Sequence, residues 1–369
     1  MRKYKLRELL TIKNGCDYRH LSTGSVPVYG SGGFMCFVNQ AVSNKPSILL
    51  PRKGTLNNIM FIDKPFWTVD TMYWSEIKED IVEPYYLYNY LKVLKFDGIR
   101  TGSTLPSMTS SAYYDIPVIL PDYNKQTRVA NILKLLNNKI ELNNKINQEL
   151  EQMAKIIYDY WFVQFDFPDE KGRPYKSANG KMVYNEVLKR EIPDGWEVKK
   201  LTDVFNTYQP KTISDKELIS DGKYFVYGAN GIIGKYNLYN HQNSEIYITC
   251  RGASCGNIGR TLPNSWITGN AMVVQPKMDY MCNEYIYQHL RYLNMQKAIS
   301  GSAQPQITRT NLNVFNIIIP SKEILTTYRE IIQPIISYKL NAIKENENLA
   351  DIRNFLLPLL MNGQVSIQD

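Results

Sequence analysis

The sequence has few of the residues that build metal, redox or disulfide sites. Its 369 residues include five cysteines, no Cys-x-x-Cys pair and three histidines. A zinc site needs clustered soft ligands, whereas these residues are scattered. Five cysteines without pairing motifs are typical of free thiols in a reducing compartment. We therefore expect no metal site and a cytoplasmic location.

The sequence also lacks a hydrophobic run long enough to cross a membrane. The longest late run, FLLPLLM (Phe355–Met361), is short and contains a proline, whereas a membrane helix needs about 18 apolar residues. The basic N-terminal stretch is interrupted by Arg7 and Glu8, which is not typical of a signal peptide. We expect no membrane partner.

Motifs for catalysis on DNA are missing too. The chain contains neither the [DNS]PP[YFW] tetrapeptide that adenine methyltransferases use to hold a flipped base nor the GxxxxGK[ST] loop of a motor. A loose Mg²⁺-nuclease pattern can be drawn from Pro193-Asp194 and Asp221-Gly222-Lys223, but it is common by chance, and Asp194-Gly195 is typical of a turn. We expect no catalytic residues; a self-contained DNA-modifying enzyme is the less favoured alternative.

What the chain does have is positive charge. Its net charge is +8 and its pI about 9.0, which favours a polyanionic partner such as nucleic acid. Its length allows two or three domains. Hydrophobic residues make up 44%, enough for each domain to have a core.

The chain also repeats itself. VYGSGGFMCFVN (Val28–Asn39) matches VYGANGIIGKYN (Val226–Asn237), 198 positions later. Four further blocks match in the same order: Pro51–Phe61 with Thr249–Arg260, Phe66–Trp74 with Ser265–Val274, Gly102–Thr109 with Gly301–Thr308, and Ile116–Pro121 with Phe315–Pro320. The same order and the nearly constant offset indicate a tandem duplication of roughly 200 residues per unit.

The glycines of Val226–Asn237 leave two readings open. They could cradle a phosphate, but the spacing is GxxGxxG in one copy and is lost in the other. A nucleotide-binding loop must also be followed by a helix, and no helical pattern follows here. We therefore favour a β-hairpin with a tight glycine turn over a phosphate cradle.

The expected fold class is α+β, with two strand-rich globular domains that alternate with two long helices. The predicted segments are domain 1 (1–121), a first long helix (122–164), a connector (165–195), domain 2 (196–320) and a second long helix (321–363). Each domain should contain one short helix, at Pro84–Leu94 and at Asn283–Leu293.

Coiled-coil spacing of three and four residues runs along both long helices. The apolar positions predicted to form the helix pair or a partner interface are Val129, Ile132, Leu136, Ile146, Leu150, Met153, Ile335, Ile343, Ile352 and Leu356. Asn143 occupies a position where an apolar residue is expected and could set the register. Pro334 should kink or restart the second helix.

Neither helix can bury its stripe alone, so we expect an antiparallel pair related by a pseudo-two-fold axis. A helix of about 35 residues spans roughly 50 Å, and one turn of B-DNA is about 34 Å. The helices could therefore act as a ruler between two DNA half-sites.

Loops of the globular domains carry side chains that contact phosphates or base edges. The candidate DNA-binding residues are Arg52, Lys53, Thr55, Asn57, Asn58, Arg100, Ser103 and Ser107 in the first repeat, and Arg251, Ser254, Asn257, Ser302, Gln304, Gln306 and Arg309 in the second. The glycines among them permit close backbone approach.

The repeat layout, the GSxxPxxT block and the segment KIIYDYWFVQFDFPDEKGRPY followed by REIPDGWEVKKL resemble the specificity subunit of type I restriction-modification systems, over essentially the whole chain. The resemblance implies that each domain reads half of a split duplex DNA target and that the helices dock methyltransferase subunits, usually two. It also implies a restriction-translocation subunit, and S-adenosylmethionine, ATP and Mg²⁺ held by these partners.

A coiled-coil scaffold with protein-binding modules is the other alternative. It predicts no salt-sensitive affinity for duplex DNA, whereas phosphate contacts make affinity fall steeply with salt.

Overall fold

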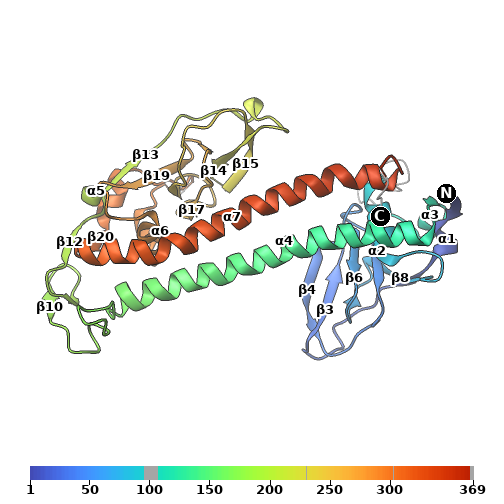
Figure 1. Ribbon diagram of the computed structural model, residues 1–369, viewed down its shortest axis with the longest axis horizontal. Coiled ribbons are helices and arrows are strands. Elements are labelled where there is room, and N and C mark those ends of the chain that lie inside the picture. The colour runs from blue at the N-terminus through green and yellow to red at the C-terminus, as the bar shows by residue number, and fades with distance from the viewer. Residues whose placement is uncertain (95–106, 230, 302, 366–369) are drawn as a thin grey trace. The chain divides into compact units, whose positions relative to one another are not determined.

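The computed structural model describes residues 1–94, 107–229, 231–301 and 303–365, and it divides into two compact units (Figure 1). Unit 1 contains Met1–Asn143 and Glu345–Asp369, and unit 2 contains Asn144–Lys344. Two long helices, α4 (Tyr123–Tyr158) and α7 (Lys322–Met361), each contribute to both units. Among the described residues, no helix combines the length and apolar character needed to cross a bilayer.

Unit 1 is built on two small sheets. The four-stranded sheet has the order β2 (Leu10–Asn14), β8 (Met72–Ile77), β5 (Ser47–Pro51), β6 (Met60–Ile62), and the three-stranded sheet has the order β4 (Gly33–Val38), β3 (Val26–Gly30), β7 (Trp67–Thr68). A further pair joins β1 (Arg2–Lys5) to β9 (Pro117–Leu120). The helices before α4 are α1 (Leu6–Leu9), α2 (Pro84–Val93) and α3 (Ser110–Tyr114).

Unit 2 repeats this topology strand for strand. Its four-stranded sheet has the order β13 (Phe205–Tyr208), β19 (Ala271–Pro276), β16 (Ile246–Thr249), β17 (Ile258–Arg260). Its three-stranded sheet has the order β15 (Gly231–Tyr236), β14 (Tyr224–Gly228), β18 (Trp266–Ile267), and β12 (Glu197–Lys200) pairs with β20 (Asn316–Ile319). α5 (Leu201–Val204) and α6 (Asn283–Tyr292) take the places of α1 and α2. The predicted duplication is therefore confirmed.

The two predicted short helices are present as α2 and α6, and both pack on the central strands. Pro84 opens α2, and the Glu83 side chain caps it by accepting from the Tyr86 backbone N–H at 2.6 Å. The inner strand β5 is buried at every position, so α2 covers a continuous apolar surface. The same holds for α6 on β16.

The repeated glycine stretch forms a β-hairpin in both units, as predicted. Gly30 pairs with Gly33 between β3 and β4, and Gly228 pairs with Gly231 between β14 and β15. Gly33 and Gly231 have φ values of +113° and +80°, which side chains with a Cβ rarely adopt.

Within each unit, α4 and α7 run antiparallel (Figure 1). In unit 1, Asn137 bonds to Arg353 and Asn143 to Glu345; in unit 2, Glu151 bonds to Lys339, and the Trp161 ring contacts that of Tyr328. Partner numbers fall along α7 as they rise along α4, which defines the antiparallel pair.

Asn143 lies buried in this pair, 2% exposed. Its side-chain amide donates to Glu345 Oε2 at 2.7 Å and to Asn346 Oδ1 at 2.9 Å. A buried amide with two such partners resists axial slippage, because a shifted helix would leave the amide unpaired. Its role in setting the register stays a prediction.

The buried stripe of α7 lies one residue later than the sequence pattern suggests. Ile332 and Ile336 are buried, whereas Ile331 is 43% exposed and Ile335 only half-buried. The doublets of IIQPII satisfy helical periodicity in either phase, so spacing alone could not choose.

The second helix does not restart at Pro334, because α7 is one continuous helix; the alternative expectation, a kink at Pro334, stays a prediction. Pro334 is exposed, so the backbone carbonyl that loses its hydrogen-bond donor can face water. The buried neighbours Ile332 and Ile336 anchor the helix on both sides.

The stretch predicted as a polar connector is a folded part of unit 2. It contains a hairpin of β10 (Met182–Asn185) and β11 (Arg190–Pro193), and Phe165, Phe167 and Ile192 join the main core of the unit. The two compact units divide the chain within both long helices, whereas the five predicted segments keep each helix whole. The boundaries of those segments stay a prediction.

Candidate nucleic-acid interface

Three loops of unit 1 meet at one end of its sheets. The loop Arg52–Asn58 follows β5; its Arg52 carbonyl accepts from the Met108 N–H at 3.0 Å, and Lys53 forms an isolated bridge with Ser107. The hairpin turn is fastened to the same loop, since the Asn58 side-chain amide donates to the Ser31 carbonyl at 2.8 Å. The predicted residues from sequence blocks far apart are thus brought together.

Unit 2 builds the same cluster with different residues. The loop after β16 forms a bridge from Arg251 to Gln306, and the Cys250 carbonyl accepts from the Ile307 N–H at 3.1 Å. Ser254 Oγ donates to the Ala229 carbonyl of the hairpin turn at 2.5 Å. The backbone frame is therefore shared between the units, while the side chains that it presents differ.

Several predicted side chains point to solvent from this frame. Lys53, Thr55, Asn57, Arg251, Asn257, Gln304 and Gln306 are exposed, and Arg52, Asn58, Ser107 and Ser254 are half-buried. The guanidinium of Arg52 lies over the Tyr73 ring at 5.9 Å from its centroid, which orients it. Asn58 and Ser254 also hold the hairpin turns in place through their side-chain hydrogen bonds, a role that the sequence did not predict.

Charge near the unit 1 hairpin is mixed. Arg19 bonds to Asp17 at 3.0 Å, and this hydrogen bond lowers the pKa of the Asp17 carboxyl. The Arg19 charge is therefore partly neutralised, and the exposed Lys53 is the better candidate for a phosphate contact.

Some predicted residues do not join the clusters. Arg309 lines a separate cavity of unit 2 with Lys277 and Thr310. Arg100, Ser103 and Ser302 lie outside the described residues.

The predicted helix-interface residues vary in exposure. Val129 is buried in the core of unit 1, and Ile132, Leu136, Ile146, Leu150, Ile335, Ile343 and Leu356 are half-buried. Met153 and Ile352 are 49% and 47% exposed, so these two side chains are available to a partner chain.

Ion pairs and hydrogen bonds that the sequence did not predict attach the sheets of each unit to its long helices. In unit 1, Lys134 on α4 bonds to Glu83 at 2.8 Å. In unit 2, Glu151 on α4 accepts from Arg291 on α6 at 2.7 Å and from Lys339 on α7. Burial alone would raise the pKa of Glu151, but Lys339 and Arg291 together lower it.

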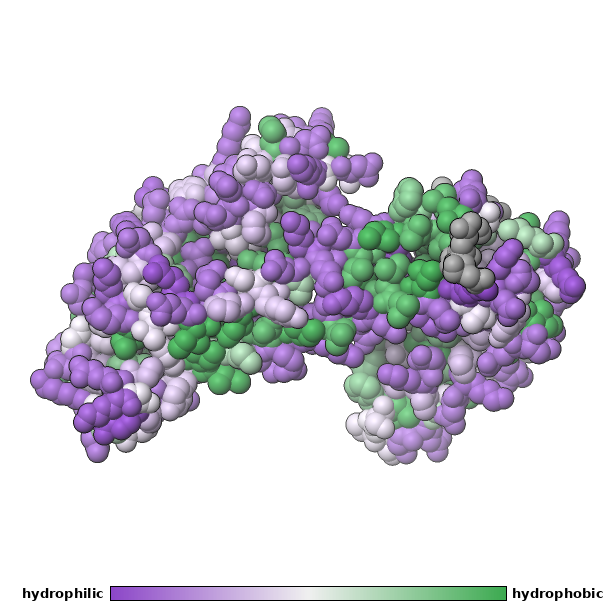
Figure 2. All heavy atoms as spheres, viewed as in Figure 1, coloured by the Kyte–Doolittle hydropathy of each residue, from purple (hydrophilic) through white to green (hydrophobic). Residues whose placement is uncertain are grey.

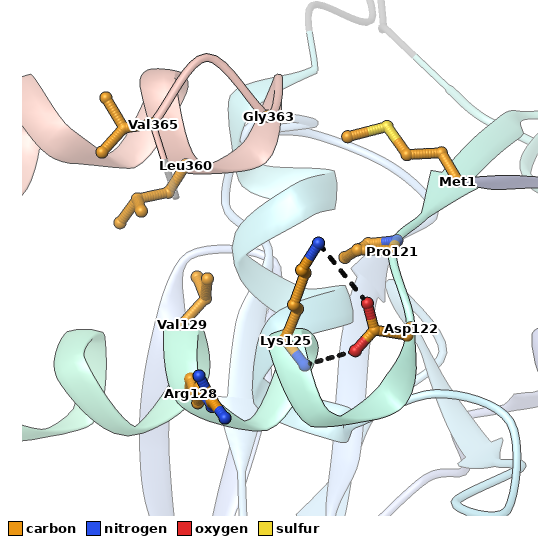
Figure 3. Close-up of a pocket in the computed structure, with 9 residues that line it drawn as sticks. All are labelled: Met1, Pro121, Asp122, Lys125, Arg128, Val129, Leu360, Gly363 and Val365. Carbon is orange, nitrogen blue, oxygen red and sulfur yellow. Dashed lines mark hydrogen bonds and ion pairs between the residues drawn. The ribbon is translucent and has the colours of Figure 1, made fainter. Parts of the chain in front are cut away.

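A cavity of about 130 Å³ lies in unit 1 between the start of α4 and the end of α7. Figure 3 shows Val129 and Leu360 facing each other across it, with Asp122 bonded to Lys125 at its edge. Asp122 also caps α4 by accepting from the Lys125 N–H at 3.0 Å. These charges satisfy each other, so the cavity has the character of a packing gap.

The nuclease pattern is not assembled as a metal site. Asp194 bonds to Lys181 at 2.8 Å across the β10–β11 hairpin, and Gly195 has the positive φ of a turn. Within the described ranges, no three metal-ligating side chains gather.

The sequence matches one protein family over both repeats. The model of the type I restriction modification DNA specificity domain matches residues 1–152 and 193–351. The chain belongs to this family. Its members recognise DNA sequence and are not catalytic, and the chain is accordingly a non-catalytic DNA-recognition chain.

Named members of the DNA specificity family resemble this chain over most of its length. The MjaIX specificity subunit of Methanocaldococcus jannaschii is 26% identical, covering 88% of this chain and 79% of that protein. The HindI specificity subunit of Haemophilus influenzae is 26% identical, covering 79% of each. A type I S subunit from M. genitalium shares the fold, with a TM-score of 0.64 at 18% identity, covering 97% of this chain and 95% of that one.

Proposed function

We propose that the two units of this specificity chain read the two halves of a split duplex DNA target. The observation that carries the proposal is that both units build the same loop cluster with the same backbone contacts but different side chains. The bridge between the loops joins Lys53 to Ser107 in unit 1 and Arg251 to Gln306 in unit 2. A protein that reads two different half-sites needs this combination of shared backbone and changed contacts.

In this proposal, the cations of each cluster bind phosphates, and the amides and hydroxyls reach base edges. Arginine and lysine neutralise backbone charge without reading sequence, whereas asparagine, glutamine and serine discriminate bases in the major groove. The glycines of the loops let the backbone approach the duplex closely.

The helices would dock the modification subunits, usually two in this family, and support a restriction-translocation subunit. Exposed hydrophobic side chains of unit 2 follow helical steps from Met153 and Ile156 on α4 to Tyr160 and Val163 in η1 (Asp159–Val163), the π-helical turn that continues it. Figure 2 shows hydrophobic side chains at the surface along this part of α4 and along the C-terminal part of α7. Such a stripe suits a protein partner. S-adenosylmethionine, ATP and Mg²⁺ would belong to the partner subunits, and the assembled complex would act in the cytoplasm.

Salt titration of the complex with its modification subunits tests the DNA interface. We expect the affinity for target duplex to fall steeply with salt, and Lys53→Ala to reduce the logarithmic salt slope by about one. Lys45→Ala is the matched control, because Lys45 is also exposed but precedes the opposite end of β5. Equal slopes for both variants would contradict the assignment of Lys53.

Methylation mapping of genomic DNA with and without the chain identifies the target. We expect one split motif with two defined halves. A continuous motif, or no change in methylation when the chain is removed, would contradict the proposed function.

A further inference from the structure

Both hairpins present two adjacent hydrophobic side chains to solvent directly after the glycine turn. In unit 1 these are Phe34 and Met35, 55% and 48% exposed. In unit 2 the same positions hold Ile232 and Ile233, 51% and 36% exposed. Single exposed hydrophobic residues are ordinary, but an exposed pair at the same place in both copies is a repeated feature.

A glycine in each hairpin makes room for the second side chain of each pair, Met35 or Ile233. A Cβ on Gly30 would lie 2.9 Å from Met35 Sδ, and a Cβ on Gly228 would lie 3.1 Å from Ile233 Cδ1. Both hairpins also shift register at the same step, between Val28 and Tyr29 and between Val226 and Tyr227. The backbone is therefore shaped alike around two chemically different apolar pairs.

The hairpin turns are hydrogen-bonded to the candidate DNA loops and to the segment before β8. The Ser31 N–H donates to Thr71 Oγ1 at 3.3 Å, and the Ser31 carbonyl accepts from Asn58. In unit 2, Ser254 holds Ala229 in the corresponding way. The hairpins that carry the apolar pairs are hydrogen-bonded to loops that carry exposed Lys53 and Arg251. These cations favour a nucleic-acid partner over an apolar protein surface, although the charge around the unit 1 hairpin itself is mixed, with Asp17 and Asp70 beside Arg19.

We propose that Phe34 and Met35 in unit 1, and Ile232 and Ile233 in unit 2, are specificity-determining residues that contact thymine 5-methyl groups in the major groove. This inference rests on the proposed function. A two-stranded ribbon fits the major groove, and thymine is the base that presents an apolar methyl group there. The Phe34–Met35 pair and the Ile232–Ile233 pair differ in shape, so the two hairpins should contact thymine within different neighbouring base sequences.

Replacing thymine by deoxyuridine tests this contact, because it removes only the methyl group. Once the motif is mapped, each half-site is synthesised with uracil at its thymines, and binding by the complex with its modification subunits is measured. We expect uracil in the unit 1 half-site to weaken wild-type binding about fourfold per contacted methyl. Phe34→Ala should show a smaller thymine preference than wild type, and Phe34→Ala combined with Met35→Ala should bind thymine and uracil duplexes equally.

Two controls separate the hairpin from its surroundings. Ile119→Ala removes another exposed hydrophobic side chain of unit 1, on β9, and should keep the full thymine preference. Ile232→Ala should reduce the preference only in the other half-site. The Phe34→Ala variant should keep the wild-type salt slope, since no charge changes.

The outcomes distinguish the two proposals. A half-site without A·T pairs, or wild-type binding that ignores uracil, overturns the thymine contact while salt-dependent binding upholds the proposed function. Absence of salt-dependent binding and of a split motif overturns both. If Phe34→Ala instead releases the modification subunits, the hairpin contacts protein, and the proposal is wrong.

Discussion

At the scale of single residues, His289 is the group whose burial has the clearest consequence. It lies in unit 2, where its Nδ1 bonds to Tyr158 Oη at 2.9 Å, between α6 and α4. Burial lowers its pKa from 6.5 to about 4. The folded state therefore favours neutral histidine, while the unfolded state takes up a proton at a higher pH.

This shift predicts an acid-dependent loss of stability. The stabilisation is complete above the unfolded pKa of 6.5 and is lost as pH falls toward about 4, with a maximum of about 3 kcal/mol. We expect His289→Gln to lose less stability than wild type between about pH 7 and pH 4.5, measured by urea unfolding. His20→Gln, at an exposed position, should follow the wild-type profile. Identical profiles for all three proteins would rule out His289 as the titrating group.

At the scale of elements, the exposed hydrophobic side chains of α4 allow subunit binding to be tested without disturbing the fold. Ile156 is 66% exposed, so a charged replacement leaves the core of unit 2 intact. We expect Ile156→Lys to fold normally and to bind the modification subunits at least tenfold more weakly, because a buried unpaired charge opposes docking.

Val187→Lys provides the control for this prediction. Val187 is 59% exposed and lies in the β10–β11 turn, away from the stripe. Circular dichroism checks the fold, and co-purification with titrated subunits measures assembly. Unaltered assembly of Ile156→Lys would remove this stripe from the docking surface.

Sequence pattern predicted elements well where one signal dominated. The α2 start at Pro84 and the glycine hairpins each have a local cause that acts within a few residues. It did not show that the helix continues through Pro334, where the buried residues Ile332 and Ile336 anchor it on both sides. It also missed the folded connector, whose aromatic residues pack on one another, on Trp196 and into the core of unit 2.

At the scale of the whole molecule, the proposed ruler depends on the length of both helices. Four residues inserted after Asn144 in α4 and after Lys344 in α7 would add about 6 Å to each helix while leaving the Asn143–Glu345 contact intact. We expect the spacer between half-sites to lengthen by about two base pairs, with both half-sites unchanged. Methylation mapping of the variant measures this spacer directly.

Exchange of residues 1–120 for the corresponding domain of another specificity subunit is the complementary control. It should change one half-site and keep the spacer. A variant with inserted helical turns that alters a half-site but not the spacer would refute the ruler.

The sequence by itself determined the duplication, the alternation of strand-rich domains with long helices, and the loops that carry cations and amides. These follow from order, spacing and local propensity, which a linear chain displays directly. Only the tertiary structure decided that Ser31, Lys53 and Ser107 share one cluster, which phase of IIQPII is buried, and that the hairpin glycines seat an exposed apolar pair. Those outcomes depend on contacts between segments distant in sequence, where packing and hydrogen-bond satisfaction choose among patterns that periodicity leaves equivalent.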